Sequence, residues 1–284
     1  MRLMSNNQWK CDGNCDAWRA DGLDCSAPAR VKGLLRAYEA ILPDAMGLQE
    51  VSQLMAHLMM DRLGSLTLSD GTPVRYEYIS GGDTPIVYRR DRLKLLESGF
   101  FLYDEAVPGL EGAFNNNESK SYAWAAFEDR RDGQRFAMMS THLWWKSGRP
   151  ESATFQAGSN VARAYQIRLA SARMDDIMAR YDCPGVLMGD LNASVHSLCL
   201  EAAFEEGWRD VHDLAVGERD ETKGHHPCGP AGFSRGEPGT FDQAIDHILL
   251  KAPRGARVER FGRLSETWFD AISDHYPLYA DITF

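Results

Sequence analysis

The chain alternates between short apolar runs and longer amphipathic segments, and this alternation constrains its fold more than any other feature. Three segments carry apolar residues at the 3.6-residue period and predict helices: residues 31–42, 51–64 and 165–179. Five short apolar runs are bounded by charged or turn-forming residues and predict strands: residues 84–88, 122–127, 136–139, 186–188 and 248–250. Because helices and strands alternate irregularly, with a hairpin expected around Asp132-Gly133, the pattern favours mixed sheets in an α/β or α+β sandwich.

Length and composition favour one folded domain. A chain of 284 residues can still be organised around a single hydrophobic core, and no repeat, linker or long charge block marks a boundary within it. With 44% hydrophobic and 25% charged residues, the sequence excludes the disordered, collagenous and low-complexity classes. We therefore expect one domain that spans residues 1–284.

The net charge bears on the class of partner. The sequence has 31 Lys and Arg residues against 41 Asp and Glu residues, which gives a net charge of −10. Such a chain repels a phosphate backbone at long range. The charge balance therefore argues against binding of duplex nucleic acid, and nothing in the sequence indicates an oligomeric state.

No membrane-spanning or targeting segment can be recognised in the sequence. No apolar run approaches the roughly 18 residues needed to cross a bilayer, and polar Asn6 and Asn7 lie where a signal peptide would have its apolar core. We therefore expect a cytoplasmic protein without a membrane span. The six scattered cysteines predict free thiols, with a structural metal or an oxidised pair among Cys11, Cys15 and Cys25 as the alternative.

Polar residues suited to metal or proton chemistry lie repeatedly at the ends of strand-like runs or within them. They are Glu50, His142, Asp190, Asn192, Asp246, Asp274 and His275. Each alone has a structural explanation, such as a turn or a helix cap, and the neighbouring His247 could be a core histidine. Because sheet proteins place rigidly held active-site groups at strand ends, the repeated occurrence predicts one functional site.

The segments around these residues resemble the endonuclease/exonuclease/phosphatase superfamily over nearly the whole chain. In order, they are Asn7, Leu48-Gln49-Glu50-Val51, Ser140-Thr141-His142-Leu143, Gly189-Asp190-Leu191-Asn192, Ile245-Asp246-His247-Ile248 and Ser273-Asp274-His275. The resemblance implies a four-layer sandwich in which two mixed β-sheets pack face to face with helices on the outer faces. It also implies hydrolysis of a phosphate ester with Mg²⁺ or Mn²⁺.

The resemblance assigns the metal and water chemistry to five of these residues. Glu50 would be the principal metal ligand, and Asn7 and Asp274 would contribute directly or through water. Asp190 would orient or deprotonate the attacking water, and Asn192 would hold that water or the phosphate. Mg²⁺ prefers such hard oxygen ligands and retains several waters.

The resemblance assigns the proton chemistry to the two histidines. His142 would donate to a phosphoryl oxygen. His275, oriented by Asp246, would be the other acid/base or phosphate-stabilising group, because a carboxylate partner favours the protonated imidazole. Either Asp190 or His275 could take the proton from water.

The chain departs from the family pattern at two positions. Ala244 stands where the family often has Arg, and His247 stands where it often has Tyr. A cation that contacts phosphate or packs nearby is therefore missing or supplied elsewhere, and Lys120 and Arg163 are the candidates, unless both are surface charges.

Two unusual loops bear on substrate recognition. Trp144 and Trp145 directly follow the His142 motif and precede Lys146 and Arg149, so they could stack on a base or ring. The alternative is that one tryptophan lies in the core and the other at the rim. The second loop, residues 223–229, contains two adjacent histidines, but a zinc site there would need further ligands.

These observations predict a Mg²⁺-dependent phosphoesterase in which activated water attacks a metal-polarised phosphoryl group. The expected substrate is a phosphate mono- or diester of a small molecule, a lipid headgroup or a nucleotide. A single-strand nuclease similar to the poly(A)-shortening branch is the enzymatic alternative. A catalytically silent binding module is the other, although the intact set of motif residues argues against it.

Overall fold

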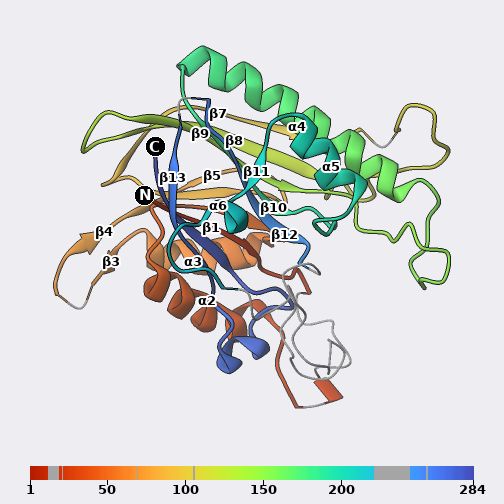
Figure 1. Cartoon of the computed structure of the whole chain (residues 1–284). Coiled ribbons are helices and arrows are strands. Elements are labelled where there is room, and N and C mark those ends of the chain that lie inside the picture. Colours follow the sequence, from red (N-terminus) through yellow and green to blue (C-terminus); the bar gives the residue numbers. More distant parts are fainter. Residues whose placement is uncertain (12–18, 21, 69, 105, 221–243, 254) are drawn as a thin grey trace.

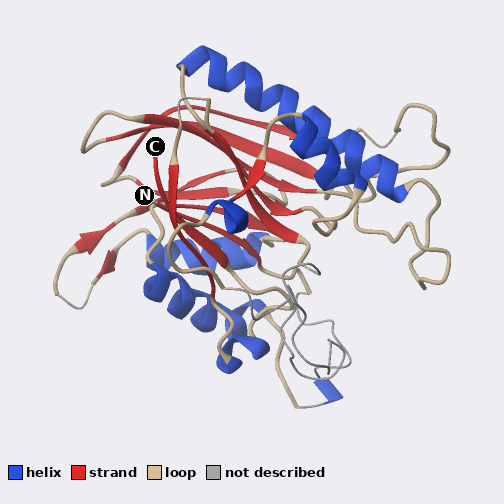
Figure 2. Ribbon diagram, viewed as in Figure 1, coloured by secondary structure: helices blue, strands red, loops and turns tan. Residues whose placement is uncertain are grey.

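Two six-stranded sheets pack face to face, and helices cover the outer face of each sheet (Figure 1). Figure 2 shows the resulting four layers as strands between two groups of helices. The computed structural model describes residues 1–11, 19–20, 22–68, 70–104, 106–220, 244–253 and 255–284. The four-layer mixed α/β fold predicted from the sequence is confirmed.

The first sheet has the strand order β13-β14-β1-β2-β6-β5. Its strands are β1 (Arg2–Asn7), β2 (Ala45–Gln49), β5 (Tyr76–Ile79), β6 (Ile86–Arg89), β13 (Arg257–Arg263) and β14 (Leu278–Thr283). Strands β1 and β2 are parallel, and the other neighbours are antiparallel. A separate short pair consists of β3 (Leu66–Thr67) and β4 (Pro73–Val74).

The second sheet has the strand order β11-β12-β10-β9-β8-β7. Its strands are β7 (Leu93–Leu102), β8 (Ser121–Asp129), β9 (Arg135–His142), β10 (Gly185–Asp190), β11 (Arg209–Asp210) and β12 (Asp246–Lys251). Strands β9 and β10 are parallel, and the other neighbours are antiparallel. The hairpin predicted around Asp132-Gly133 joins β8 to β9, and Gly133 adopts the positive φ of 74° that such a turn requires.

The three predicted helices are present and cover the sheets on opposite sides. Helices α2 (Ala27–Ile41) and α3 (Gln53–Leu63) bury their apolar faces on the first sheet, and α4 (Ser159–Tyr181) covers the second (Figure 1). Helix α4 begins earlier than its apolar stripe. Three shorter elements are α5 (Leu198–Glu205), α6 (Val211–Leu214) and the 3-10 helix η2 (Thr267–Ala271). No helix in the described part of the chain is long and apolar enough to cross a membrane.

All five predicted strand runs lie in or largely within strands, with β6 beginning two residues later than its apolar run. Strand β7 was not predicted because its side chains are mostly half-buried or exposed, so it lacks a continuous apolar run. Among the cysteines, Cys25, Cys183 and Cys199 are free thiols as predicted. Cys15 and Cys228 lie outside the described residues, as does the histidine-containing loop 223–229.

Hydrogen bonds between the end of β2 and strand β9 hold the two sheets together at one edge of the sandwich. The Gln49 side chain at the end of β2 donates to Ser140 Oγ of β9 at 3.1 Å, and Ser140 Oγ donates to the Leu48 carbonyl at 3.0 Å. Gly47 permits this approach, since a Cβ there would lie 2.9 Å from Ser140 Cβ. The residues that follow β2 and β9 are therefore held close together.

The motif residues meet at this edge because strands of opposite direction end and begin there. Asp190, the last residue of β10, pairs in register with His142, the last residue of parallel β9, and with Asp246, the first residue of antiparallel β12. Asp246 thus opens a strand, and Asp274 and His275 precede β14, whereas the sequence pattern suggested strand ends. The predicted convergence still holds, because a strand that starts at this edge is as well placed as one that ends there.

Candidate active site

The side chains at this edge form one contact network that joins both sheets. Asn7 ends β1 and Glu50 follows β2 in the first sheet, whereas His142, Asp190 and Asp246 belong to the second. Asp274 and His275 come from the segment before β14. The hydrogen bonds and ion pairs described below link all seven side chains. Six of them were predicted to meet from their positions beside strands, and Asn7 was implied by the family resemblance.

Asn7 holds the two central carboxylates together. Its Nδ2 donates to Glu50 Oε1 at 3.2 Å and to Asp190 Oδ2 at 3.0 Å, and its Oδ1 accepts from the backbone N–H of Trp9. The other carboxylate oxygen of Glu50 accepts from the backbone N–H of Lys10 at 3.0 Å. Glu50 adopts a φ of +57°, a conformation that costs a non-glycine residue energy and often occurs at functional sites.

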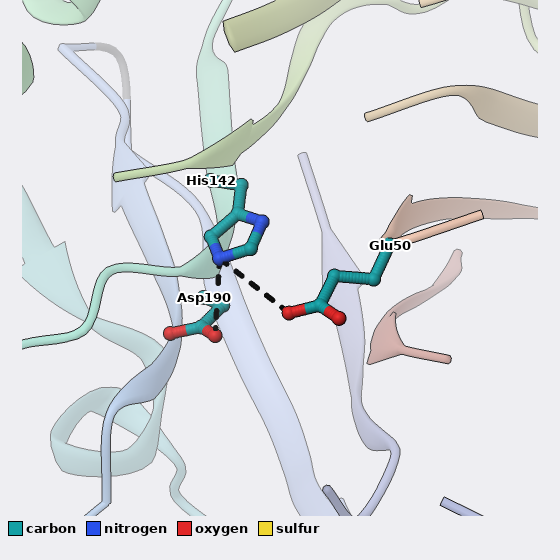
Figure 3. A group of neighbouring side chains, drawn as sticks. All are labelled: Glu50, His142 and Asp190. Atoms are coloured by element: carbon teal, nitrogen blue, oxygen red, sulfur yellow. Dashed lines mark ion pairs between the residues drawn. The ribbon is translucent and has the colours of Figure 1, made fainter. Parts of the chain in front are cut away.

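His142 faces both carboxylates, as Figure 3 shows. Its Nε2 lies 3.8 Å from Glu50 Oε1 and 3.5 Å from Asp190 Oδ2. Its Nδ1 lies 3.1 Å from Asp83 Oδ2, and its Nε2 lies 2.7 Å from the Lys120 ammonium group. Because a carboxylate oxygen accepts and an ammonium group donates, these partners match the tautomer of His142 that carries a proton on Nδ1 and accepts at Nε2. In that tautomer Lys120, rather than His142, is the donor on this side of the site.

Asp83 and Lys120 are therefore central to the site, although only Lys120 was a candidate from the sequence. Lys120 is buried rather than a surface charge, and burial lowers its pKa against the opposing charges of Glu50, Asp190 and Asp83. Asp83 was missed because it lies in the Gly81-Gly82-Asp83 loop, which has the composition of an ordinary turn.

His275 forms the second half of the site and pairs with Asp246 as predicted. Its Nδ1 lies 2.6 Å from Asp246 Oδ2, and its Nε2 points to Asp190 Oδ2 at 3.8 Å and to Asp274 Oδ1 at 3.9 Å. Burial alone would lower the pKa of His275, but the surrounding carboxylates raise it well above its usual value. The arrangement therefore favours a protonated imidazole directed at the central carboxylate.

The acidic groups respond differently to this shared environment. Burial would raise the pKa of Asp190, but the nearby positive charges, that of His275 first and that of Lys120 also, outweigh it and lower the pKa to about 2. Burial raises the pKa of Asp274 to about 7, with the charges of Glu50 and Asp190 adding to this shift and His275 opposing it. Asp190 is therefore a stable anion, whereas Asp274 lies where negative charge is in excess.

This excess of negative charge fits a divalent cation. The ligand atoms of Glu50, His142 and Asp190 lie within 4.8 Å of one another, and those of Asp190, Asp246 and His275 form a second such group. Asp274 belongs to neither group of described side chains, but a cation beside Glu50 would relieve the repulsion that contributes to its raised pKa. The oxygen-rich donor set suits Mg²⁺ or Mn²⁺ better than a soft metal.

The turn after β10 places Asp190 and Asn192 through local hydrogen bonds. Asp190 Oδ1 accepts from the backbone N–H of Asn192 at 2.8 Å, and the Asn192 side chain donates to the Leu143 carbonyl at 3.2 Å. Gly189 has a φ of +148°, and a Cβ there would lie 1.8 Å from the Thr141 carbonyl oxygen. Only glycine therefore fits directly before Asp190.

Arg30 connects two loops of the site, and its role was not predicted. Arg30 is only 2% exposed. Its guanidinium donates to the carbonyls of Gln8, Trp9 and Ile272 at 2.6 to 2.7 Å, and to the carbonyl of Cys25 at 2.8 Å. Gln8 and Trp9 directly follow Asn7, and Ile272 lies two residues before Asp274. No motif marks Arg30 because its partners are backbone atoms.

The predicted substrate-binding aromatics divide between core and rim. Trp144 is 1% exposed and packs against Phe114, so in this conformation it offers no face to a ligand. Trp145 is 42% exposed. The structure thus supports the alternative in which one tryptophan is a core residue and the other lies at the rim.

Arg163 is buried rather than a surface charge. It donates to the carbonyls of Trp144 and Lys146 at 3.0 and 2.7 Å, and so holds the loop that follows His142. His247, which stands where the family often has Tyr, is a core histidine whose Nδ1 lies 2.7 Å from Asp210 Oδ2. Both residues support elements of the site without joining the central network.

Solved structures with this fold cover the whole chain at low identity. An endonuclease/exonuclease/phosphatase family protein from Bacteroides thetaiotaomicron has 19% identity and a TM-score of 0.75, with 100% of this chain and 95% of that chain covered. A mannosyl-6-phosphatase from the same species has 20% identity and a TM-score of 0.74, with 100% of both chains covered. TDP2 from D. rerio, in complex with a single-strand DNA product, has 19% identity and a TM-score of 0.68, with 100% and 99% covered.

No protein-family model and no curated protein matches the sequence. The likeness to the solved structures establishes the fold, which is that of endonuclease/exonuclease/phosphatase proteins. The fold implied by the sequence motifs is therefore confirmed.

Proposed function

We propose that residues 1–284 form one catalytic domain of the endonuclease/exonuclease/phosphatase superfamily, and that it hydrolyses phosphate esters with a divalent cation. The observation that carries this proposal is the meeting of Glu50 and Asp190 with the Asp246–His275 pair at one edge of the sandwich. A silent binding module would have no need to keep these groups in contact.

Mg²⁺ or Mn²⁺ is the proposed cofactor, held by Glu50 and Asp274 with Asn7 as an orienting group or a water-mediated ligand, and when bound it polarises a phosphoryl oxygen. Asp190 stays ionised at neutral pH because its pKa is about 2, and it orients the attacking water. Asn192, in the same turn, holds that water or the phosphate.

Two cationic groups would receive the phosphoryl oxygens. His275 in its protonated form directs Nε2 towards Asp190, so it can donate to a phosphate bound there. Lys120 lies beside His142, which also contacts Asp190, and supplies a second donor. In this arrangement His142 positions Lys120 and Asp83, and Lys120 is the group that donates to a phosphoryl oxygen.

The proposed substrate is a phosphate mono- or diester of a small molecule, a lipid headgroup or a nucleotide. The net charge of −10 supports a substrate with few phosphates. A single-strand nuclease is the second candidate, favoured by the likeness to TDP2 bound to a single-strand DNA product. The salt dependence of binding separates the two, since a nuclease that contacts several phosphates loses affinity steeply with salt.

The test is hydrolysis of 4-nitrophenyl phosphate and bis(4-nitrophenyl) phosphate by the wild type and by Asp190→Asn. We expect turnover of one of them with Mg²⁺ or Mn²⁺, loss of turnover with a chelator, and a large decrease in Asp190→Asn. Absence of turnover on both esters and on short single strands, at any metal concentration, would support a binding module instead.

A further inference from the structure

A hollow of about 670 Å³ opens beside Asn192, on the second-sheet side of the site. It lies between the loop that follows His142, the start of α4 and the segment that follows Asn192. Its charged and aromatic lining consists of Trp145, Lys146, Arg149, Arg163 and His196. Its volume is within the range of about 300 to 1,000 Å³ that small-molecule sites occupy.

The lining of this cationic hollow carries three formal positive charges and no carboxylate. Arg163 donates only to neutral oxygens, namely the carbonyls of Trp144 and Lys146 and the side chain of Asn160. Within the described part of the chain, neither Lys146 nor Arg149 takes part in an ion pair. The protein has a net charge of −10, so its overall composition does not explain why three positively charged side chains gather in one hollow without a carboxylate in its lining.

Two of the three cations, Lys146 and Arg163, are also held in place before any ligand arrives. The Lys146 ammonium group lies 5.6 and 5.8 Å from the ring centroids of Trp144 and Trp145, which restricts a side chain that is otherwise flexible. Arg163 is 6% exposed and fixes the backbone on both sides of Trp145. A ligand therefore meets an arranged positive surface and loses little entropy to order it.

We propose that the cationic hollow binds a second anionic group of the substrate while the phosphate to be cleaved lies against Asn192 and Asp190. This inference rests on the proposed function, since it defines which phosphate esters the same site accepts. The substrate class is a small phosphate ester that carries a further phosphate or carboxylate. A nucleic acid strand fits less well, because the cations gather in one hollow and a strand requires a series of phosphate contacts.

The experiment measures binding by calorimetry in the presence of Mg²⁺, in an Asp190→Asn background that slows turnover. Four probes are compared: glycerol 3-phosphate, 3-phosphoglycerate, 2,3-bisphosphoglycerate and a 5′-phosphorylated hexathymidylate. We expect roughly tenfold or greater preference for a probe with a second anion over glycerol 3-phosphate, as for hydrogen bonds that involve charged groups. 3-Phosphoglycerate tests a carboxylate as the second anion, and 2,3-bisphosphoglycerate shows whether a phosphate added to that carboxylate increases the affinity.

The double variant Lys146→Met/Arg149→Gln should remove most of this preference, since methionine keeps the aliphatic contact with the indoles. The matched control is Lys94→Met/Arg131→Gln, which removes two exposed cations of the β7–β9 region that pair with Glu128 and Asp129. The control should keep the preference. An unchanged preference in the first double variant, or tighter binding of the hexanucleotide than of every small probe, would overturn the inference.

The outcome is independent of whether the enzyme assay succeeds. If 4-nitrophenyl phosphate is hydrolysed but the hollow shows no preference for a second anion, the proposed function stands and the inference fails. If no ester is hydrolysed but the preference is present and depends on Lys146 and Arg149, the hollow is an anion site and the proposed function fails.

Discussion

Replacing Arg30 tests whether the two loops that carry Asn7 and Asp274 are held by one buried guanidinium. In Arg30→Met the carbonyls of Gln8, Trp9 and Ile272 lose their donor, together with that of Cys25. Hydrogen bonds that involve a charged group contribute about 1.5 to 3 kcal/mol each, but bonds that share one group are not additive. We therefore expect a loss of about 3 to 5 kcal/mol in the free energy of unfolding.

The same variant should weaken metal binding, which a loss of stability alone would not do. Groups that orient metal ligands typically change metal affinity by roughly 10- to 100-fold when removed. We expect the Mg²⁺ concentration at half-maximal turnover of 4-nitrophenyl phosphate to rise by roughly tenfold. Denaturant unfolding and a metal titration measure the two effects separately.

Arg92→Met is the matched control for Arg30→Met. Arg92, directly before β7, is also a largely buried guanidinium, but it bonds to Asp129, the last residue of β8 in the second sheet. This variant should lose stability and keep the Mg²⁺ midpoint. If both variants shift the midpoint equally, or if Arg30→Met leaves it unchanged, Arg30 is a stabilising residue without a role in the site.

Three further predictions concern the pH response and the backbone of the site. Asp246→Asn removes a charge that raises the pKa of His275. If the protonated imidazole is the productive form, the alkaline limb of the pH–rate profile should move to lower pH. An alkaline limb that does not move would exclude protonated His275 as the productive form. Gly189→Ala should lower the free energy of unfolding by about 2 to 5 kcal/mol because its Cβ would overlap the β9 backbone. A melting temperature equal to that of the wild type would contradict this packing. Burial would lower the pKa of His247, but its hydrogen bond with Asp210 outweighs burial and raises the pKa. The pair therefore stabilises the fold at pH values below the usual histidine pKa. This contribution is lost as pH rises through the higher pKa of the folded state. Asp210→Asn should flatten that decline in stability, measured by denaturant titration between acidic and alkaline pH.

The parts of the site that could be predicted from the sequence are those whose chemistry and strand context occur together in short segments. Glu50, Asp190 and His275 each lie in such a segment, so their convergence followed once the strands were recognised. Their detailed partners depend on residues distant in the chain. Asp83 reaches His142 across 59 positions, and nothing local to its loop indicates that contact.

The burial of the two tryptophans shows why the loop beyond His142 could not be assigned in advance. Trp144 and Trp145 are adjacent and chemically identical, and only the packing of Phe114 and α4 decides which one is buried. Arg163 likewise resembles a surface cation in sequence, but its acceptors are backbone carbonyls contributed by another segment. Such roles depend on tertiary contacts that composition and periodicity do not encode.

The central claim is that Glu50 holds a divalent cation needed for phosphoester hydrolysis, and a metal titration of turnover in Glu50→Gln tests it most directly. The substitution keeps the shape of the side chain and removes one negative charge from the oxygen-rich site. Glu97→Gln, which affects a partly exposed glutamate paired with Arg180, is the control. The account predicts that Glu50→Gln raises the Mg²⁺ midpoint and lowers maximal turnover, while its melting temperature and the behaviour of Glu97→Gln stay close to the wild type. Unchanged turnover and an unchanged Mg²⁺ midpoint in Glu50→Gln would contradict it.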